Sequence, residues 1–483
     1  MTEGVTRRRA ISGLAALAVV GFDPRSRTWI TSASAAPNFS QVPVLDGSLF
    51  VDAAHLQAAG DDFGHLVHRI PAAVLLPGSL ADVLKMVRYA REQGVKVAMR
   101  GQGHAQFGQC QVDAGLVIDS SSLDTIHSLT SDRARVDAGV RWSELVLAAA
   151  EQGLTPPVLT DYLELSVGGT LSVGGIGGTM QHFGVQGDNV LELEVVTGEG
   201  KLVTCSRHER AELFDAVTSG LGQFALILRA TVRLLPAPAQ VLVFHLFYDD
   251  IHVFIRDQLR LVRDARFDYL EGQVVTAPSG TGFRYMIEAG SFHTPPCAPD
   301  EARLLRGLSD DATTRERLDQ PYLDFAFRLA PTIEFLKSIG VWGFPHPWLS
   351  LFLPASATEG YVGELLATLT TADTGQGPIL LYPVLRSRVH RPFFRLPREE
   401  VSFAFNILRT APPDPVVQAA MVASNRALYE AAIALGGTRY ASGAIPMTPR
   451  DWRLHFGEVW ADFARAKRRF DPSAILTPGA GIF

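Results

Sequence analysis

Cysteine is scarce in this chain, and the cysteine spacing matches no zinc or iron–sulfur pattern. Only three occur in 483 residues: Cys110, Cys205 and Cys297. The odd number leaves at least one thiol free, and although an exported protein could hold one disulfide, the spacing does not identify it. Several histidines likewise lack metal-ligand spacing, and we predict no metal site. We interpret these as structural or polar-surface residues: His182, His346, His390 and His455.

An excess of positive charge is also missing. The chain has 44 Lys and Arg against 50 Asp and Glu, a formal net charge of −6, and this balance argues against a nucleic-acid partner. Neither a G-x-x-x-x-G-K-[ST] loop nor a G-x-S-x-G elbow occurs, which argues against P-loop and serine-hydrolase chemistry. The length and the 47% hydrophobic content are enough for two or three globular domains. Nothing in the sequence indicates the oligomeric state, and we take a monomer as the default.

No apolar run is long enough to span a bilayer. The longest N-terminal run covers 11–22; Arg7, Arg8 and Arg9 precede it, and small residues follow at 33–36. This order is typical of a secretory signal, and the paired arginines indicate the twin-arginine route. We therefore predict a signal peptide over 1–36 and export to the periplasm or the extracellular space. The alternative is a basic tail without a targeting role.

Hydrophobic periodicity divides the remaining chain into parts. Over 40–238, strand-like and helix-like segments alternate; one predicted helix has Ser79 as its N-cap and ends at Gly94. Over 239–440, strand-like runs such as VLVFHLFY and YLEGQVV alternate with helical stretches, which predicts an α+β domain with helices on one face of an antiparallel sheet. We expect the final part, 441–483, to return to the first domain and pack there.

Two glycine-rich segments point to a large phosphate-bearing cofactor. RGQGHAQFGQ at 100–109 places His104 on a glycine loop directly after a predicted strand, without completing G-x-G-x-x-G. TDYLELSVGGTLSVGGIGG at 160–178 places Asp161 before an apolar stretch that we expect to be a strand. Small residues let the backbone approach a pyrophosphate closely. A flavin enzyme with Asp161 as a proton acceptor is therefore the leading interpretation, and a capped tight turn is the alternative.

A third segment, FDYLEGQVV at 267–275, carries Glu271 on a predicted strand. An isolated glutamate on an alternating strand usually faces solvent, and Leu270 and Gly272 leave its direction open. Taken alone, this residue predicts little.

Together these segments resemble the flavin-linked oxidases whose flavin domain is named after vanillyl-alcohol oxidase and p-cresol methylhydroxylase, and among these the cytokinin dehydrogenases. The resemblance runs from about residue 70 to the C-terminus. It rests on 160–178, FDYLEGQVV and on these further stretches: LPGSLADVLKMVRYAREQGVKVAMRGQGHAQFGQ, NVLELEVVTGEGKLVTCS, FDAVTSGLGQFALILRA, PHPWLSLFLP and FDPSAILTPGAGIF. It implies a two-domain α+β flavin oxidase, in which 40–238 and 441–483 form a split FAD-binding domain around an inserted substrate domain.

The resemblance also implies residue roles. His104 would carry FAD covalently on its imidazole. Asp161 would take the substrate N–H proton while hydride leaves the adjacent carbon for flavin N5, and Glu271 would hydrogen-bond the substrate. The imine product would hydrolyse to an aldehyde and an amine. Besides His104 and Asp161, the implied FAD contacts are Gly101, Gln102, Gly103, Ala105, Gln109, Ser166, Ser172, Ile176 and Leu226.

Three positions depart from the family pattern. Ala105 replaces a serine that bonds the flavin, Leu385 stands at an asparagine position, and Ala480 replaces a glutamine. These changes leave open a second reading, in which the same scaffold oxidises an alcohol, a sugar or a natural-product intermediate. A flavin-bearing binding protein is a third reading, against which Asp161 and Glu271 argue. The electron acceptor would be oxygen or a quinone-like compound.

Overall fold

A computed structural model of the protein describes residues 19–23, 28–31, 42–280, 282–375 and 377–483. The first sheet has the strand order β2-β1-β3-β4-β6-β5, and its strands β4, β6 and β5 run parallel. The elements of this part are β1 (Val19–Asp23), β2 (Thr28–Thr31), β3 (Ser48–Phe50), α1 (Ala53–Ala59), β4 (Ala73–Leu76), α2 (Leu80–Gln93), β5 (Val97–Arg100) and β6 (Leu116–Asp119).

Helix α2 confirms the local prediction. Ser79 is its N-cap in an extended conformation, and Gly94 ends it at φ +67°, a left-handed conformation that glycine adopts without steric cost. Val83, Met86 and Val87 are fully buried against the first sheet. Most of the predicted signal peptide lies outside the described residues, and its described parts form β1 and β2.

The second sheet is antiparallel, with the order β11-β10-β12-β8-β7. Strands β10 and β11 form the predicted hairpin. The elements of this part are β7 (Ile126–Leu129), β8 (Arg133–Asp137), α3 (Trp142–Ala150), β9 (Leu154–Thr155), α4 (Val167–Val173), α5 (Met180–Phe183), β10 (Val190–Thr197), β11 (Leu202–Ser206), α6 (Ala211–Val217), β12 (Ala225–Arg233) and β13 (Leu235–Pro236).

The third sheet is the largest, with eight antiparallel strands in the order β17-β14-β16-β15-β19-β20-β18-β21. Its strands are β14 (Gln240–Tyr248), β15 (Tyr269–Thr276), β16 (Phe283–His293), β17 (Glu316–Pro321), β18 (Leu349–Pro354), β19 (Ile379–Leu385), β20 (Val401–Ile407) and β21 (Thr438–Arg439). The sequence did not predict β16, because Arg284, Glu288 and Gly290 interrupt its apolar pattern.

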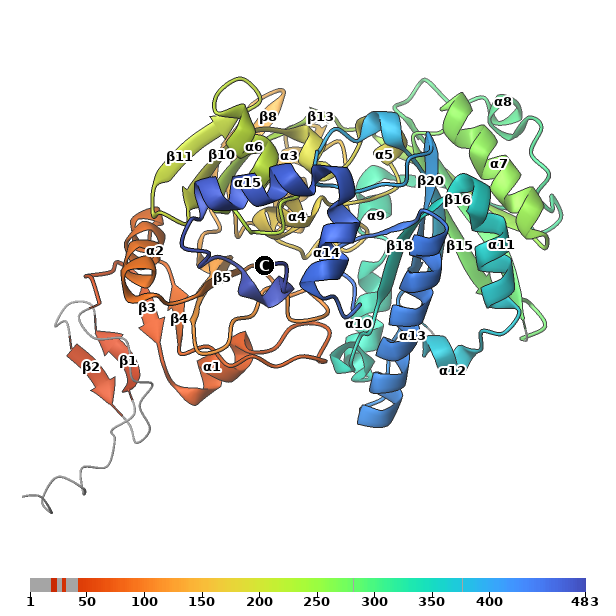
Figure 1. Cartoon of the computed structure of the whole chain (residues 1–483). Helices are drawn as coiled ribbons and strands as arrows, with labels where there is room; N and C mark the ends of the chain where they lie inside the picture. The colour runs from red at the N-terminus through yellow and green to blue at the C-terminus, as the bar shows by residue number, and fades with distance from the viewer. Residues whose placement is uncertain (1–18, 24–27, 32–41, 281, 376) are drawn as a thin grey trace, which may run out of the picture.

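Helices cover one face of the third sheet, as predicted for an α+β domain. Figure 1 shows α7, α11 and α13 on the outer side of β15, β16, β18 and β20, and their apolar side chains share one core with these strands. The helices between β14 and β21 are α7 (Ile251–Asp264), α8 (Glu301–Leu305), α9 (Tyr322–Ala326), α10 (Ala330–Ser338), α11 (Ala355–Leu366), α12 (Thr371–Thr374) and α13 (Pro415–Ala434). The opposite face of the sheet is left to form the site.

The C-terminal segment lies against the first two sheets. Leu476 bridges to Val97 of β5 in parallel, and the core of the second sheet includes side chains of α14 (Pro449–Phe456) and α15 (Trp460–Phe470). Figure 1 places the C-terminus between α14 and β5. Buried Lys467 anchors the segment: its ammonium group contacts Asp471 at 2.8 Å and donates to the carbonyl of Gln223 at 2.9 Å.

Candidate active site

Residues from the first, second and third sheets line a cavity of about 940 Å³. This volume lies at the upper end of the range of about 300–1,000 Å³ for small-molecule sites and suits a dinucleotide cofactor. Apart from Glu271, every site residue predicted from the sequence lines this cavity: Gly101, Gln102, Gly103, His104, Ala105, Gln109, Asp161, Ser166, Ser172, Ile176 and Leu226. Segments far apart in the sequence are therefore brought together around one space.

The glycine loop after β5 has a conformation that larger residues would not tolerate. A Cβ atom on Gly101 would lie 1.9 Å from the hydroxyl oxygen of Ser166, the residue that precedes α4. Gly103 has φ +66°, a left-handed conformation that favours glycine. Asp161 was predicted to precede a strand, which is wrong: helix α4 begins at Val167. The helix fits because Gly168 packs closely on Ala138.

Two glutamines that follow this glycine loop line the cavity. Gln109 donates from its Nε2 atom to the carbonyls of Ser442 and Gly443, at 3.1 and 3.2 Å, and so holds the loop to the segment after β21. Gln106 lines the cavity, and its Oε1 atom is buried with no hydrogen-bond partner among the described residues. Because buried acceptors are normally paired, this oxygen fits a site that receives a donor from a bound group.

His104 lies in a stack of aromatic rings. Its imidazole is 3.9 Å from the Phe63 ring, and Phe63 stacks in turn on His346 at 4.0 Å, measured between centroids. Burial, and then the charge of His346, lowers the pKa of His104 to about 3, so the imidazole is neutral and keeps an unshared electron pair. The sequence interpretation of His346 as structural or polar-surface missed that it lines the cavity.

Asp161 is held by two donors from other parts of the chain. Arg328, between α9 and α10, donates from Nη2 to Oδ1 of Asp161 at 2.6 Å, and the Tyr269 hydroxyl donates to the same oxygen at 3.1 Å. The Asp161 side chain remains 26% exposed. The carboxylate thus has a fixed direction and remains accessible, as a proton acceptor requires.

Glu271 and Glu288 face each other on β15 and β16, yet their environments differ. Glu271 is only 1% exposed; burial first, and then the negative charge of Asp161, raises its pKa well above the ordinary value. Burial would also raise the pKa of Glu288, but Arg328 and His245 outweigh burial and lower it. The raised pKa favours the neutral form of Glu271, which can donate a hydrogen bond, beside a charged neighbour. The usual expectation that an isolated strand glutamate faces solvent does not hold for Glu271.

Arg328 connects these carboxyl groups and was not predicted from the sequence. Besides Asp161, its guanidinium donates to Oε2 of Glu288 at 3.2 Å and lies 5.0 Å from the centre of the Tyr269 ring. Behind Glu288, His245 contacts Oε1 at 3.5 Å, and on its other side it contacts exposed Glu316 at 2.7 Å. A lone arginine in the apolar run PYLDFAFRLAP is the signal that could have found it.

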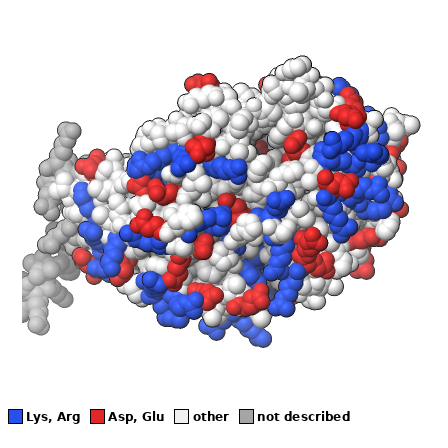
Figure 2. Space-filling view, turned by 90° about the horizontal axis from the view of Figure 1, so that it is seen from above, with Lys and Arg blue, Asp and Glu red and all other residues white. Residues whose placement is uncertain are grey.

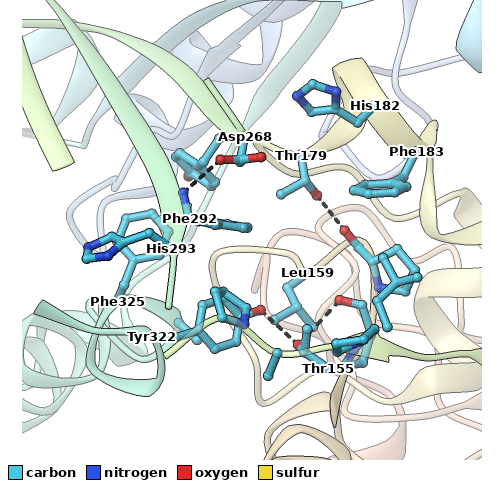
Figure 3. Close-up of a pocket in the computed structure, with 18 of the residues that line it drawn as sticks. Thr155, Leu159, Thr179, His182, Phe183, Asp268, Phe292, His293, Tyr322 and Phe325 are labelled. Atoms are coloured by element: carbon cyan, nitrogen blue, oxygen red, sulfur yellow. Dashed lines mark hydrogen bonds between the residues drawn. The ribbon is translucent and has the colours of Figure 1, made fainter. Parts of the chain in front are cut away.

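A second cavity of about 660 Å³ adjoins the first, and the two share Thr160, Asp161 and Arg328. Its wall includes five phenylalanine and tyrosine side chains and four prolines. Figure 3 shows that polar groups of this wall are bonded to the protein itself: Asp268 accepts from the amide of Phe292, and Thr179 donates to a carbonyl. Asp161 therefore lies in the partition between two cavities.

The three departures from the family pattern lie in different environments. Ala105 and Ala480 line the large cavity. Leu385 does not; it packs against the core beneath α7, α11 and α13. Leu385 is thus no part of the cavity wall, and only Ala105 and Ala480 alter the polarity of this wall directly.

Cys110, Cys205 and Cys297 are all free thiols. Burial raises the pKa of Cys110 to about 12, so this cavity-lining thiol stays protonated. In the described ranges, no cluster of three His, Cys, Asp or Glu side chains is arranged to hold a metal ion.

Acidic and basic side chains are intermixed on the face shown in Figure 2, without a broad region of one sign. None of the helices in the described part of the chain combines the length and apolar character that a bilayer crossing requires.

Comparison with protein-family models gives two matches. Residues 71–206 match the FAD binding domain, and residues 283–483 match the domain described as cytokinin dehydrogenase 1, FAD and cytokinin binding. The first match contains the His104 loop and α4, and the second contains Arg328 and the C-terminal segment. Both matches therefore cover walls of the large cavity.

Several relatives align along most of the chain. An oxidoreductase of the fasciation locus of Rhodococcoides fascians is 43% identical over 90% of this chain and 99% of its own length. Cytokinin dehydrogenase 4 of Oryza sativa subsp. japonica is 35% identical over 91% of this chain and 90% of its own. Cytokinin dehydrogenase 2 of Arabidopsis thaliana is 33% identical over 91% and 94%. The chain therefore belongs to the family of FAD-linked oxidoreductases that includes the cytokinin dehydrogenases.

Proposed function

We propose that this oxidoreductase dehydrogenates the C–N bond of a secondary amine that resembles a cytokinin. The observation that carries the proposal is the arrangement of Asp161 and Glu271: a carboxylate held by Arg328, and a neutral carboxyl group beside it. Relatives that align over most of the chain are named cytokinin dehydrogenases, which supports the same substrate class.

The residues of the cavity fit FAD. The loop 101–105, the start of α4 and the residues around Leu226 would hold it, and when bound the flavin supplies a two-electron sink for the hydride lost by the substrate. We propose that His104 forms a covalent bond to it, because a neutral imidazole has the free electron pair that such a bond needs. Denatured protein that keeps its yellow colour would support the link, and release of all the flavin would contradict it.

The chain's own groups then have distinct tasks. Asp161 accepts the N–H proton of the amine, which lets the nitrogen push electron density toward the carbon that loses hydride. Glu271, protonated and buried, donates a hydrogen bond that positions the nitrogen group. Arg328 fixes the direction of Asp161 and offsets its negative charge. The imine product hydrolyses to an aldehyde and a free amine.

Anaerobic mixing with N6-isopentenyladenine tests the proposal. We expect the flavin absorbance to bleach within minutes in the wild type, and Asp161→Asn to slow bleaching by about 10²–10⁴-fold, the usual contribution of a general base. The variant should keep its bound flavin. If the amine bleaches the flavin of neither protein, the proposed substrate class is contradicted. If the flavin of both proteins bleaches at the same rate, Asp161 is not the base.

We further propose that residues 1–36 direct export by the twin-arginine route, and that oxygen or a quinone-like compound reoxidises the flavin. Replacing Arg8 and Arg9 by Lys should retain the protein in the cytoplasm of its host. Unchanged export would refute this route. Peroxide release in air, compared with reduction of an added quinone, distinguishes the two acceptors.

A further inference from the structure

A row of charged side chains leads from the proposed base to the protein surface, and its outer members have no task in the proposed reaction. Measured between nitrogen and oxygen, Arg328 contacts Asp161 at 2.6 Å and Glu288 of β16 at 3.2 Å. Glu288 contacts His245 of β14 at 3.5 Å, and His245 contacts exposed Glu316 of β17 at 2.7 Å. Consecutive polar contacts therefore connect His245 to Asp161.

The register of the third sheet explains why His245 lies in this row. His245 lies opposite Glu288 on one neighbouring strand and opposite Glu316 on the other, so the three side chains share one face. Helix α9 packs on the same face of β14 through aromatic side chains, while its Asp324 is exposed, and helix α7 covers the other face. Among the described residues, the two glutamates are therefore the titratable groups that face His245, and Arg328 follows beyond Glu288.

Asp161 and Glu288 share a single guanidinium group. Arg328 donates from Nη2 to Asp161 and from Nε to Glu288. Because the raised pKa of Glu271 favours its neutral form, the two carboxylates and the guanidinium leave one negative charge unbalanced, and a protonated His245 balances it. When His245 loses its proton, Arg328 is the positive partner that remains to Glu288, and Glu288 then competes more strongly with Asp161 for the guanidinium group.

We propose that His245 is a positioning residue that keeps Asp161 in its reactive direction through Glu288 and Arg328. This inference rests on the proposed function, in which Asp161 takes the N–H proton of the amine. Protonated His245 balances Glu288, so that Arg328 stays on Asp161. Neutral His245 lets Arg328 move toward Glu288, and Asp161 then loses the donor that fixes its direction.

The surroundings of His245 set the pH range of this effect. Its hydrogen bond to Glu288, and then that to Glu316, outweigh burial and raise the pKa of His245 above its ordinary value of 6.5. His245 is therefore protonated below pH 6.5 and loses its proton as the pH rises through the folded-state pKa. We expect the positioning of Asp161 to be complete in mildly acidic solution and to weaken at higher pH.

Reciprocity provides a test that needs no substrate. If protonation of His245 strengthens the hold of Arg328 on Asp161, then the charge of Asp161 favours protonation of His245 to the same extent. Asp161→Asn should therefore lower the titration midpoint of His245 by roughly 0.5–1 in pH, measured by NMR of the flavin-loaded protein with isotope-labelled histidine. His245→Gln assigns the signal. His252, which pairs with Glu359 at 3.0 Å on helices α7 and α11, is the internal control and should keep its midpoint. An unchanged midpoint of His245 would overturn the inference.

A kinetic test follows anaerobic flavin reduction by N6-isopentenyladenine between about pH 6 and 9. The wild-type rate should fall as the pH rises through the folded-state pKa of His245, whereas His245→Gln should be about 3- to 30-fold slower at the acidic end and lack this fall. His245→Lys, which stays positively charged over this range, should restore the rate and also lack the fall. His252→Gln is the matched control and should keep the wild-type profile. The same profile in His245→Gln and the wild type would overturn the inference. If the amine reduces the flavin of no protein, the proposed function fails, while the NMR titration still decides the role of His245.

Discussion

Replacing Arg328 with Met should destabilise the protein and disturb the base at the same time. Arg328 lies between Asp161 and Glu288, with N–O distances of 2.6 and 3.2 Å; the Glu288 side chain is 9% exposed, whereas that of Asp161 is 26% exposed. At the shorter distance and an effective dielectric constant of about 20, two unit charges attract by roughly 6 kcal/mol, and desolvation offsets part of this. Removing one partner of a buried pair costs about 3–5 kcal/mol, because it leaves an uncompensated buried charge, here the charge of Glu288.

The assay is urea unfolding at pH 7, followed by tryptophan fluorescence, together with the rate of anaerobic flavin reduction. Arg317→Met is the matched control, because Arg317 lies on the exposed strand β17, pairs with Glu301 and should be replaceable without measurable change. In Arg328→Met we also expect slower flavin reduction, because Asp161 loses the donor that fixes its direction. If Arg328→Met unfolds at the same urea concentration as Arg317→Met and keeps the wild-type rate of flavin reduction, the assigned role of Arg328 is refuted.

Other side chains of the site allow further predictions. Glu271→Gln should keep flavin reduction within about 10-fold of wild type, because the raised pKa of Glu271 favours its neutral form, which glutamine resembles. Above pH 4.5 the variant should also be more stable than the wild type, which loses stability as the pH rises toward the raised pKa of Glu271. Turnover lost as completely as in Asp161→Asn would contradict this. The pKa of His245 is raised, chiefly by its hydrogen bond to Glu288, so protonated His245 stabilises the fold fully below pH 6.5 and this stabilisation is lost as the pH rises through the folded-state pKa. The unfolding midpoint of His245→Gln should lack this decline with pH. The same pH dependence in the variant and the wild type would contradict the role of His245. Iodoacetamide at pH 8 should label exposed Cys297 and leave Cys110 unmodified, as followed by mass spectrometry, because desolvation raises the pKa of the Cys110 thiol to about 12. Rapid labelling of Cys110 would contradict this raised pKa.

Local patterns predicted much of this fold because their causes are local. Ser79 and Gly94 bound helix α2 since each residue type favours its own cap position. The glycine loop with His104 was likewise evident, because Gly103 has a backbone conformation that glycine favours. The alternating runs of the large sheet were predicted for the same reason: one face of each strand packs beneath helices.

What the sequence left open depends on contacts between distant residues. The side on which helices pack decides whether Glu271 faces solvent or the cavity, and no local pattern states it. Arg328 and Asp161 are 167 positions apart, and their pairing emerges only when the two domains meet. Strand β16 was missed because its buried charges pair with residues that are distant in the sequence. Arg284 pairs with Asp249 and Asp311, and Glu288 pairs with Arg328.

The most direct test is to express the protein in a flavin-replete host and view it under ultraviolet light after denaturing electrophoresis in acid. A cavity that holds FAD through the neutral imidazole of His104 predicts a yellow protein, a fluorescent band in the wild type and no band in His104→Ala. A colourless protein that takes up no FAD on reconstitution would contradict the central claim of a flavin site.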